Sequence, residues 1–398
     1  MALLTDGQLD DLRRSNPTDD VARRLGANLR RSGGKLVGSC PMCGGGRLAK
    51  RFEVKADKWV CAVCADGGDV ISLAEKVLGL TFRQAVDWLG GARVLTPEEE
   101  DRLAKDRAAR EAKAEKEQNE YRERERSTAY GIWTRAVSLM RHELAAPGRI
   151  YFRERGIDWP DTVSLRYAPE LPYFHGKEID ERGREHPRVI YRGPAVIAAI
   201  LRPDDRFGAA HCTYIDPARP GTKAEIFDPD TGELLEAKKS RGSTQGGRIE
   251  LIMPQGCPLL RLFNGEGIET VGSVYTPMQR LGRLREGDGF WTSIDLGNLG
   301  GRAMETVPHP TLKHKNGRTV RVPGPDPDRD APAWPLPETV RELVTLGDGD
   351  SDPFLTQHAH TRCRRRYARP GLTTRTVFAP AGLDFNDVLR GKAAKVLA

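Results

Sequence analysis

The feature that most constrains the fold is a short apolar run, residues 343–346, which ends in Gly347 and then in acidic residues at every second position. Such a run predicts a buried strand of a parallel sheet, and open α/β sheets bind ligands beyond the carboxyl ends of their strands. Closely spaced carboxylates oppose each other's ionisation, and a hard divalent cation such as Mg²⁺ removes that cost. The acids are Asp348, Asp350 and Asp352. Taken alone, the motif is also open to interpretation as a solvated Asp/Gly turn.

A second strand-like run, residues 259–264, leads directly into Gly265-Glu266-Gly267. Glycine on both sides allows backbone or ligand to come close to Glu266. A strand that ends in Glu-Gly and a later strand that ends in Asp-x-Asp would place one Glu and two Asp around a common metal. The candidate metal ligands are therefore Glu266 and the aspartates of the first motif.

These two motifs resemble those of the Toprim domain of topoisomerases, primases and some nucleases. Residues 374–379 resemble its last strand, and residues 382–389 resemble the segment after it, with Asp384 as the matching acid. Leu383 stands where primases often carry a basic residue. The resemblance implies a catalytic site for Mg²⁺ or Mn²⁺ made by the acids of both motifs. The catalytic residues are Glu266, Asp348 and Asp350, and Asp352 is a further metal ligand.

Four of the seven cysteines form two Cys-x-x-Cys pairs, which are separated by 17 residues. Each pair turns two thiolates toward one point, and four thiolates make a closed zinc site that is structural, because no coordination position is open. The ligands are Cys40, Cys43, Cys61 and Cys64. Four buried, unliganded cysteines are the alternative. The odd total and this pairing fit a reducing cytoplasm better than a disulfide framework.

Residues 52–60, between the two pairs, predict a β-hairpin with its turn at Asp57-Lys58. Basic residues cluster around this hairpin, and aromatic residues are interleaved with them. They are Arg47, Lys50, Arg51, Lys55 and Lys58, with Phe52 and Trp59. Basic groups beside aromatic rings suit single-stranded nucleic acid, whose bases stack and whose phosphates are neutralised. An ordinary zinc ribbon with both aromatic rings in its core is the alternative.

Helices are predicted on both sides of the hairpin. Residues 8–25 predict two short helices, and Thr81 with Gln84 has the spacing of a capping box. The layout of residues 33–90 resembles the zinc-binding domain of bacterial and phage primases. Many members of that family have histidine at the second ligand position, where this chain has Cys43, and zinc binding is compatible with either.

The middle of the chain begins with residues 97–126, which are mainly Glu, Lys, Arg and Ala and predict a solvated helix or a frayed linker. Residues 130–144 have apolar residues at helical spacing and predict a packed helix. Residues 149–157 resemble the segment that opens the polymerase domain of phage and mobile-element primases. The next stretch is β-rich, and residues 196–201 and 211–215 predict paired strands.

The most basic local cluster of the middle is Lys238, Lys239 and Arg241. We expect it to contact phosphates of the template or of an incoming nucleotide, and an exposed loop is the alternative. His211 is interpreted as a structural strand residue. The three remaining cysteines are isolated in sequence and are expected to be inert. They are Cys212, Cys257 and Cys363.

Residues 299–337 interrupt the Toprim pattern, and Asn316-Gly317 predicts an inserted hairpin with basic arms. Residues 356–368 predict an arginine-rich helix after the acidic run. Its arginines either hold phosphates near the metals or form a solvated basic face. They are Arg362, Arg364, Arg365 and Arg366.

The predicted fold class is α+β and multidomain: a zinc ribbon with helices, a helical linker, a β-rich subdomain, and an α/β Toprim domain with a parallel sheet. The expected boundaries are a zinc-binding domain at 1–95, a charged helical linker at 96–128, the N-terminal part of an RNA polymerase domain at 129–255, and a Toprim catalytic domain at 256–398 with the insertion at 299–337.

The zinc module and the split acidic site together resemble a DNA primase of the bacterial and phage type. The resemblance implies template-directed synthesis of short RNA primers on single-stranded DNA from ribonucleoside triphosphates, with structural Zn²⁺ and catalytic Mg²⁺ or Mn²⁺. A net charge of +7 and a pI near 9.0 suit such a polyanionic partner. No P-loop motif is present in the sequence, so we expect the protein to act with a separate helicase or replisome, or alone on a phage or plasmid origin.

No apolar run is long enough to span a bilayer and no signal-peptide pattern is present, so we expect no membrane partner and a location in the cytoplasm of a bacterial host cell. Two alternatives have different activities. A recombination mediator of the RecR kind also joins four cysteines to a Toprim domain, and binds DNA without catalysis. A Toprim nuclease or topoisomerase cleaves DNA, but no region here suggests the separate tyrosine domain of a topoisomerase.

Overall fold

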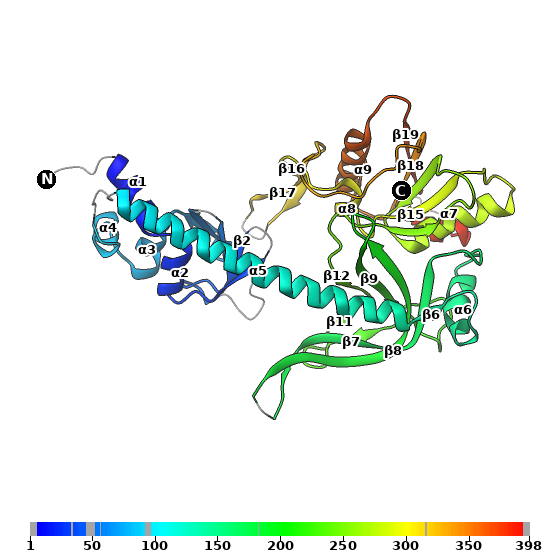
Figure 1. Cartoon of the computed structure of the whole chain (residues 1–398), viewed down its shortest axis with the longest axis horizontal. Helices are drawn as coiled ribbons and strands as arrows, with labels where there is room; N and C mark the ends of the chain where they lie inside the picture. Colours follow the sequence, from blue (N-terminus) through cyan, green and yellow to red (C-terminus); the bar gives the residue numbers. More distant parts are fainter. Residues whose placement is uncertain are drawn as a thin grey trace. The chain divides into compact units, whose positions relative to one another are not determined.

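The computed structural model describes residues 6–32, 35–44, 52–55, 57–91, 97–181, 183–314 and 317–392. The chain divides into two compact units, Met1–Glu120 and Tyr121–Ala398, and each is described by itself. The division falls inside the charged helix α5 (Pro97–Arg135), which forms as predicted and continues past residue 126 (Figure 1). No helix within the described ranges is long and apolar enough to cross a membrane.

The first unit is a five-stranded antiparallel sheet with two helices on each side of it in sequence. The strands, in spatial order, are β1 (Leu29–Ser32), β2 (Lys35–Gly38), β3 (Phe52–Lys55), β4 (Lys58–Cys61) and β5 (Asp66–Gly68). The helices are α1 (Asp6–Ser15), α2 (Thr18–Arg24), α3 (Val70–Leu78) and α4 (Phe82–Trp88). The predicted pair of helices, the hairpin and the Thr81–Gln84 capping box are all present. The hairpin turn comes one residue earlier than predicted, because Lys55 pairs with Lys58.

The second unit begins with a five-stranded antiparallel sheet in the order β12-β9-β8-β7-β6. The strands are β6 (Val137–Ser138), β7 (Leu165–Ile179), β8 (Glu185–Leu201), β9 (Phe207–Tyr214) and β12 (Lys238–Gly242). The predicted pairing of residues 196–201 with 211–215 is confirmed by the β8–β9 register, in which Ala198 lies opposite His211. A small hairpin, β10 (Ile226–Phe227) with β11 (Leu234–Leu235), lies between β9 and β12 in sequence.

The predicted helix over residues 130–144 is wrong in its second half. Helix α5 ends at Arg135, and β6 then pairs Val137 with Tyr167 at the edge of the sheet. Arg166 stacks on Trp133 and donates hydrogen bonds to the carbonyls of Trp133 (3.0 Å) and Ala136 (3.3 Å), so its guanidinium satisfies the end of the helix. Strand pairing and this cap outweigh the apolar periodicity of the segment.

The second sheet of this unit is mixed, in the order β13-β15-β14-β18-β19. The strands are β13 (Ile249–Ile252), β14 (Arg261–Gly265), β15 (Asp288–Thr292), β18 (Glu342–Gly347) and β19 (Thr373–Phe378). Four of them run parallel, and β13 is an antiparallel edge strand. The two strands predicted to carry the acidic residues, β14 and β18, are therefore adjacent and parallel.

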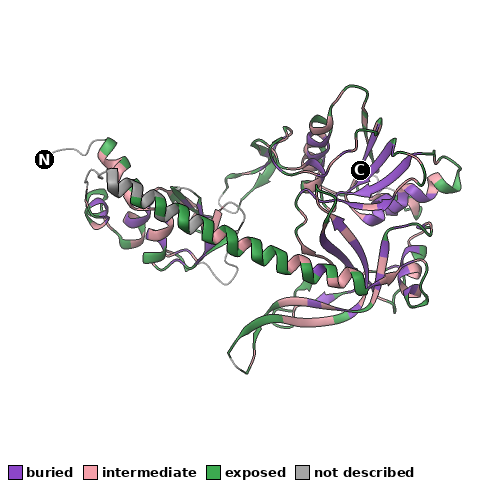
Figure 2. Cartoon of the chain, in the orientation of Figure 1, coloured by how far each residue is buried: buried purple, intermediate pink, exposed green. Residues whose placement is uncertain are grey.

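Helices cover both faces of the mixed sheet, as its buried central strands require. They include α7 (Ile268–Arg280), which packs on β14 and β15, and α9 (Pro353–Tyr367), which packs on β18 and β19. Helix α8 (Leu296–Gly300) packs on α9, and α10 (Phe385–Leu389) packs on α7. Helix α6 (Ala146–Glu154) packs against β8 of the antiparallel sheet. Alternate residues of β14 enter different cores, because Phe263 packs with Tyr275 of α7 and Leu262 packs in the cluster that contains Cys363 of α9. Buried residues concentrate in these two sheets (Figure 2).

The insertion forms the predicted hairpin, β16 (Thr306–Lys313) with β17 (Thr319–Pro323), and residues 315–316 of its turn lie outside the described residues. Arg362 of α9 is 3% exposed and donates to the carbonyls of Pro323 (3.1 Å) and Gly324. Arg366 donates to the carbonyl of Asp328 at 2.7 Å. The interpretation of these two arginines as phosphate contacts or as a solvated face is wrong, because their guanidinium groups bind the returning strand of the insertion.

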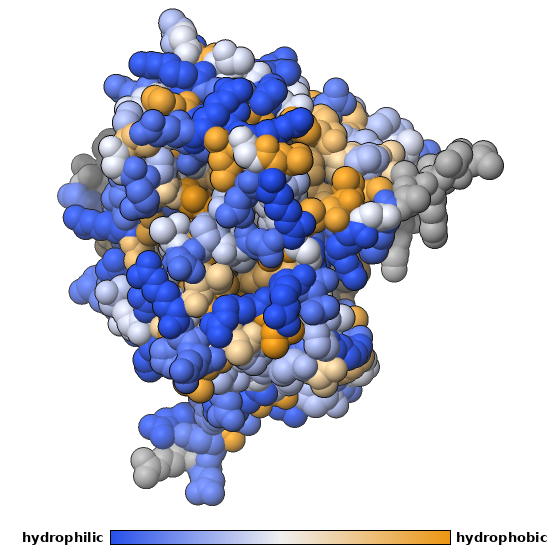
Figure 3. Space-filling view, turned by 90° about the vertical axis from the view of Figure 1, so that its right-hand side faces the viewer, coloured by the Kyte–Doolittle hydropathy of each residue, from blue (hydrophilic) through white to orange (hydrophobic). Residues whose placement is uncertain are grey.

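The surface of the protein is mainly hydrophilic where Figure 3 presents it, and hydrophobic residues form small separate groups there. The large apolar residues that are exposed are spread along the chain, and include Ile179 at 70% and Met304 at 69%. The candidate functional sites are therefore clusters of charged and metal-ligating side chains.

Candidate functional site

The four cysteines of the first unit come together in the structure. One ligand atom from each of Cys40, Cys43, Cys61 and Cys64 lies within 4.8 Å of the others. The sulfur atoms of Cys40 and Cys64 are 3.8 Å apart, and those of Cys43 and Cys61 are 3.9 Å apart. Zn–S bonds of about 2.3 Å in a tetrahedron place sulfurs about 3.8 Å apart, so the cluster fits a zinc ion.

Backbone groups support these sulfurs. The N–H groups of Met42 and Cys43 point at the Cys40 sulfur, and the N–H of Cys64 donates to the Cys61 sulfur at 3.5 Å. Burial and the neighbouring thiols raise the pKa of Cys64, so four thiolates would not coexist there without a cation. The arrangement therefore fits the predicted structural zinc site.

The acidic residues of the second unit follow two adjacent parallel strands. Gly265 of β14 lies opposite Leu346 of β18, so Glu266 and Asp348 both emerge at the carboxyl edge of the sheet. Asp348 accepts hydrogen bonds from Thr270 Oγ1 of α7 at 3.0 Å and from the backbone N–H of Phe385 at 3.5 Å. Asp348 is therefore held at the junction of β18, α7 and α10.

Electrostatic repulsion marks this edge of the sheet. Burial, Asp348 and Asp295 together raise the pKa of Glu266 to about 7. Burial also raises the pKa of Asp348 to about 6, against the hydrogen bond from Thr270 and with a contribution from Asp384. Two half-buried carboxylates that resist ionisation in this way are a site where a cation relieves repulsion.

The other acids of this region have additional tasks. Asp295 and Asp384 accept backbone N–H bonds as the N-caps of α8 and α10, at 2.7 Å and 2.6 Å. Asp350 is exposed, and contributes to the raised pKa values of both Glu266 and Asp348. Asp352, a predicted metal ligand, instead caps α9 through the N–H of Leu355 (2.9 Å) and lies 3.1 Å from His309 Nε2 of the insertion.

The carboxylates are less tightly gathered than the cysteines. Among the residues that the structure describes, the four cysteines alone form a group of three or more ligand atoms within 4.8 Å of one another. The set Glu266, Asp348 and Asp350 does not reach that spacing. Their oxygen donors nevertheless have the chemistry that Mg²⁺ and Mn²⁺ prefer, and carboxylates near Mg²⁺ leave room for water and phosphate ligands.

Gly349, between the two aspartates, is required by close backbone approach. A Cβ atom at this position would lie 2.2 Å from the carbonyl oxygen of Pro380 and 2.6 Å from that of Ala379. The chain also bonds here, because the N–H of Gly349 donates to the Leu383 carbonyl at 2.9 Å. The Asp-Gly-Asp spacing therefore serves the packing of the loop as well as the placement of its acids.

A partly buried ion pair lies beside this site. Lys238 Nζ is 2.9 Å from Glu269 Oε2, and Tyr151 donates its hydroxyl to Glu269 Oε1 at 2.8 Å. Burial alone would raise the pKa of Glu269, but Lys238 and Lys223 outweigh it and hold that pKa well below its usual range. A Cβ at Gly267 would lie 3.7 Å from Lys238 Nζ, so this cation borders the Glu266 loop.

Sequence reasoning missed Glu269, Tyr151 and Lys223. Glu269 lies in the first turn of α7, where an acidic residue is normally interpreted as a solvated partner of the helix dipole. Its partners come from α6, β12 and the loop after β9, so no local spacing connects them. The one available signal was an acid three residues after Glu266.

Strand β12 divides the predicted basic cluster. Lys238 lies opposite Thr213 and faces Glu269, whereas Lys239 and Arg241 lie opposite Cys212 and Ala210. Successive side chains of a strand point to opposite faces, so the latter two point away from the carboxylates. Lys239 stands 4.2 Å over the Tyr173 ring and donates to the Phe174 carbonyl, and Arg241 pairs with Glu125 at 3.2 Å. The alternative of an exposed loop is wrong, because these residues form a strand.

The basic residues predicted around the zinc hairpin are only partly described. Lys55 and Lys58 are exposed on β3 and β4. Arg47, Lys50 and Arg51 lie outside the described residues. The prediction that Trp59 stacks on nucleic acid is corrected by its burial: Trp59 is 1% exposed, packs 5.9 Å from Phe52 and donates to the Asp69 carbonyl at 2.9 Å. The aromatic rings fill the small core of the unit.

The remaining histidine and cysteines have structural surroundings. His211 is buried in β9 with Nδ1 3.1 Å from Ser240 Oγ, and burial with nearby Lys238 lowers its pKa to about 4. Burial raises the pKa of Cys212 and of Cys363 to about 12, so both thiols stay protonated. Cys257 is half-buried.

Residues 123–251 match the family DUF7146, a domain of unknown function, and no curated protein matches the chain. The zinc-binding and RNA polymerase domains of Aquifex aeolicus primase are similar at 14% identity, over 97% of this chain and 82% of that one, with a TM-score of 0.33. A DNA primase domain from Pseudomonas aeruginosa is similar at 12% identity, over 67% and 75%, with a TM-score of 0.37. The DnaG primase catalytic domain bound to ssDNA is similar at 12%, over 69% and 79%, with 0.35. Because these values are low, the site rests on its own geometry.

Proposed function

We propose that the protein is a DNA primase, a nucleotidyltransferase that makes short RNA primers on single-stranded DNA. The observation that carries the proposal is the position of Glu266 and Asp348, side by side after adjacent parallel strands and with their pKa values raised to about 7 and 6. Carboxylates so placed at the carboxyl edge of an α/β sheet favour divalent metal and phosphate chemistry.

Glu266, Asp348 and Asp350 would hold Mg²⁺ or Mn²⁺. Bound metal would supply charge that aligns a ribonucleotide 3′-hydroxyl with the α-phosphate of the next nucleotide and stabilises the pyrophosphate that leaves. Thr270 and the Phe385 N–H orient the Asp348 carboxylate. Asp352 has no part in this set, because its carboxylate caps α9 and faces His309.

Lys238 would steady a triphosphate at the same site. Glu269 fixes its ammonium group at 2.9 Å, beside Gly267, and Tyr151 fixes Glu269 in turn. Burial lowers the pKa of Lys238, but Glu269 outweighs this and raises it, so the ammonium stays charged. A fixed charge next to the metal ligands costs no reorganisation when the phosphate arrives.

The zinc-bearing unit would read the template. A structural Zn²⁺ at the four cysteines would hold its ribbon, and exposed Lys55 and Lys58 would neutralise template phosphates. In this proposal residues 256–398 are the Toprim catalytic domain, residues 129–255 are the N-terminal part of the polymerase domain, and a separate helicase or replisome of a phage or plasmid supplies unwound DNA.

A primer-synthesis assay tests the proposal. The full chain is incubated with a panel of single-stranded oligonucleotides, labelled ribonucleoside triphosphates and Mg²⁺ or Mn²⁺. We expect labelled RNA of a few nucleotides, which disappears with Asp348→Ala and Glu266→Ala. Asp330→Ala, at an exposed loop position, is the matched control and should leave the product unchanged. Cleaved DNA would instead identify a nuclease, and DNA binding without product would identify a recombination mediator.

A further inference from the structure

A cavity of the second unit lies on the face of the antiparallel sheet opposite to Glu269. It has a volume of about 530 Å³ and lies between α5 and strands β7, β9 and β12. This volume is within the range of roughly 300–1,000 Å³ that small-molecule sites occupy. Its lining lies within residues 121–243, almost entirely inside the region that matches DUF7146.

Strand alternation separates this cavity from the carboxylates. Lys239, Arg241 and Cys212 line it, whereas Lys238 and His211, on the neighbouring positions of the same strands, belong to the Glu269 side. A ligand in the cavity is therefore a different molecule, or a different part of one, from anything held at Glu266 and Asp348.

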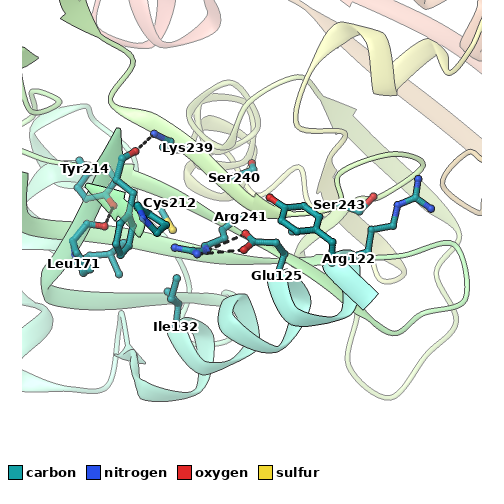
Figure 4. Close-up of a pocket in the computed structure, with 15 residues that line it drawn as sticks. Arg122, Glu125, Ile132, Leu171, Cys212, Tyr214, Lys239, Ser240, Arg241 and Ser243 are labelled. Carbon is teal, nitrogen blue, oxygen red and sulfur yellow. Dashed lines mark hydrogen bonds and ion pairs between the residues drawn. The ribbon is translucent and has the colours of Figure 1, made fainter. Parts of the chain in front are cut away.

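The cavity combines an apolar wall with cations that rest on aromatic rings. Ile132, Leu171 and Cys212 form apolar lining. Arg241 lies 4.9 Å over the Phe174 ring, and Lys239 lies 4.2 Å over the Tyr173 ring. Figure 4 shows Arg241 reaching Glu125 of α5, with Lys239 directed to a carbonyl group on the other side of the cavity. Flat apolar groups beside fixed cations suit an aromatic base that carries a phosphate.

The Glu125 carboxylate is the anion that pairs with Arg241 in this cavity. Its carboxylate lies 3.2 Å from Arg241 Nε and 3.4 Å from Arg241 Nη2, and both side chains remain partly exposed, at 28% and 23%. A solvent-accessible ion pair contributes little to stability, so a phosphate can compete with the carboxylate at modest cost. Arg122 lines the cavity from the same helix and is exposed, which adds a cation at the entrance.

We propose that this cavity binds a nucleotide, with its base against the apolar wall and its phosphate at Arg241 in the place of the Glu125 carboxylate. Binding is non-covalent, because burial holds the pKa of the Cys212 thiol at about 12. The nucleotide can come from a single-stranded nucleic acid or from a free nucleoside phosphate, which share this chemistry. The site does not depend on the proposed polymerase activity.

Equilibrium binding to the full chain tests the proposal. Fluorescence anisotropy is measured with a labelled oligodeoxythymidine and with a fluorescent ATP analogue, without added Mg²⁺ or Mn²⁺ and with Asp348→Ala as the background, so that the carboxylate site takes no part and zinc stays in place. Oligonucleotide binding that Arg241→Gln weakens identifies a strand site in the cavity, and binding of the ATP analogue alone identifies a site for free nucleotides. If neither probe binds, the proposal is overturned.

Substitutions of Arg241 and of Glu125, which form one ion pair, should change the affinity for the nucleotide in opposite directions. Arg241→Gln removes the phosphate contact and should weaken binding by about 10-fold or more. Glu125→Gln frees Arg241 and removes a competing charge, and should tighten binding several-fold. A purely structural ion pair predicts the same sign for both variants, because either one breaks it. The same sign, with both proteins folded by circular dichroism, would overturn the proposal.

If Arg241→Gln folds poorly, Arg122→Gln provides a second test of the same cavity. Arg122 is exposed at the edge of the cavity, so we expect weaker binding without loss of stability. Arg124→Gln is its matched control, because Arg124 is exposed on the same helix two residues away and does not line the cavity. Equal losses of affinity in both variants would mean that the effect is one of general charge, and would overturn the site.

Discussion

The cysteine cluster and the carboxylate site, both proposed to bind metal, are built in opposite ways. The cysteines are drawn together by two short loops, and their sulfurs already stand at the spacing of a tetrahedral zinc ion. Glu266 and Asp348 come from distant parts of the chain and meet because β14 and β18 pair in parallel with a fixed register. Closely spaced ligands are fixed by local geometry, whereas remote ligands depend on the whole sheet.

The comparison also assigns different tasks to the two metals. Thiols that cannot ionise together would need a cation to become ligands, so we expect zinc binding to be coupled to the folding of the first unit. The carboxylates stand on a sheet with its own core, and a cation there offsets repulsion without building the fold. The predictions below test this difference, from the largest expected effect to the smallest.

The largest effect is expected at the cysteines. Cys61→Ser removes one of the four proposed zinc ligands. Zinc binding at a structural site of this kind contributes about 10–16 kcal/mol to folding, so the first unit should lose its zinc and unfold. Elemental analysis should find one zinc per wild-type chain and none in the variant, with loss of the near-ultraviolet signal of Trp59. Cys257→Ser, at a cysteine outside the cluster, is the control and should keep both. A folded, zinc-free first unit would break the comparison.

Asp348→Ala should abolish catalysis while leaving the fold intact. A loss of primer synthesis of about 1,000-fold or more is expected, because a metal ligand at the reacting phosphate contributes several kcal/mol to the transition state. Thermal unfolding should shift little, since removing Asp348 also removes repulsion with Glu266. Zinc content should stay at one. If unfolding accompanies the loss of activity, the carboxylate site is structural in the same sense as the cysteines.

Glu269→Gln should destabilise the second unit by about 2 kcal/mol, because the partly buried Lys238 then loses its carboxylate partner. The double variant Glu269→Gln with Lys238→Met should recover part of this loss in denaturant unfolding. The pKa of Glu269 lies well below its usual value in the folded protein, so its contribution is present at neutral pH and is lost as the pH falls below about 4. The single variant should therefore lose less stability in acid than the wild type.

Protein without added Mg²⁺ or Mn²⁺ should become less stable as the pH rises from about 4.5 to 7. The pKa of Glu266 is about 7 in the folded protein and about 4.5 in the unfolded chain, so the unfolded chain releases the proton first. The free energy of unfolding therefore falls as the pH rises through this window. A loss on the order of 2 kcal/mol is expected with zinc in place and no Mg²⁺ or Mn²⁺ added. Mn²⁺ at pH 8 should restore it, and Glu266→Gln should reduce the loss to the part that the raised pKa of Asp348 contributes. A flat profile would mean that burial and neighbouring acids do not hold a proton on Glu266 in the folded protein.

The smallest effect is expected at Asp352. Asp352→Ala removes the N-cap of α9 and the contact with His309, and should cost about 1 kcal/mol in thermal unfolding. Primer synthesis should stay within a few-fold of the wild type. Asp352→Asn retains a capping oxygen and should recover most of the stability. A loss of activity as large as that of Asp348→Ala would mean that Asp352 is a metal ligand after all.

Sequence reasoning succeeded where short-range patterns suffice. Apolar runs that end in acids predicted β14 and β18, and Cys-x-x-Cys spacing predicted the sulfur cluster. It failed where a partner is remote. The periodicity of residues 130–144 predicted a helix, but β6 pairs with β7 there. Trp59 lies beside basic residues in sequence, yet its ring is in the core. Glu269 and Tyr151 could not be connected at all.

The amino-acid sequence by itself determined which ligand chemistries the chain carries: thiolates in two close pairs and carboxylates after two strands. Residue type, strand preference and short spacing are local properties, so they can be deduced without coordinates. Only the tertiary structure decided which acids share an edge of the sheet, that Asp352 turns to His309, and that Lys238 and Arg241 serve opposite faces of one strand. Those outcomes follow from register and side-chain direction, which long-range pairing fixes.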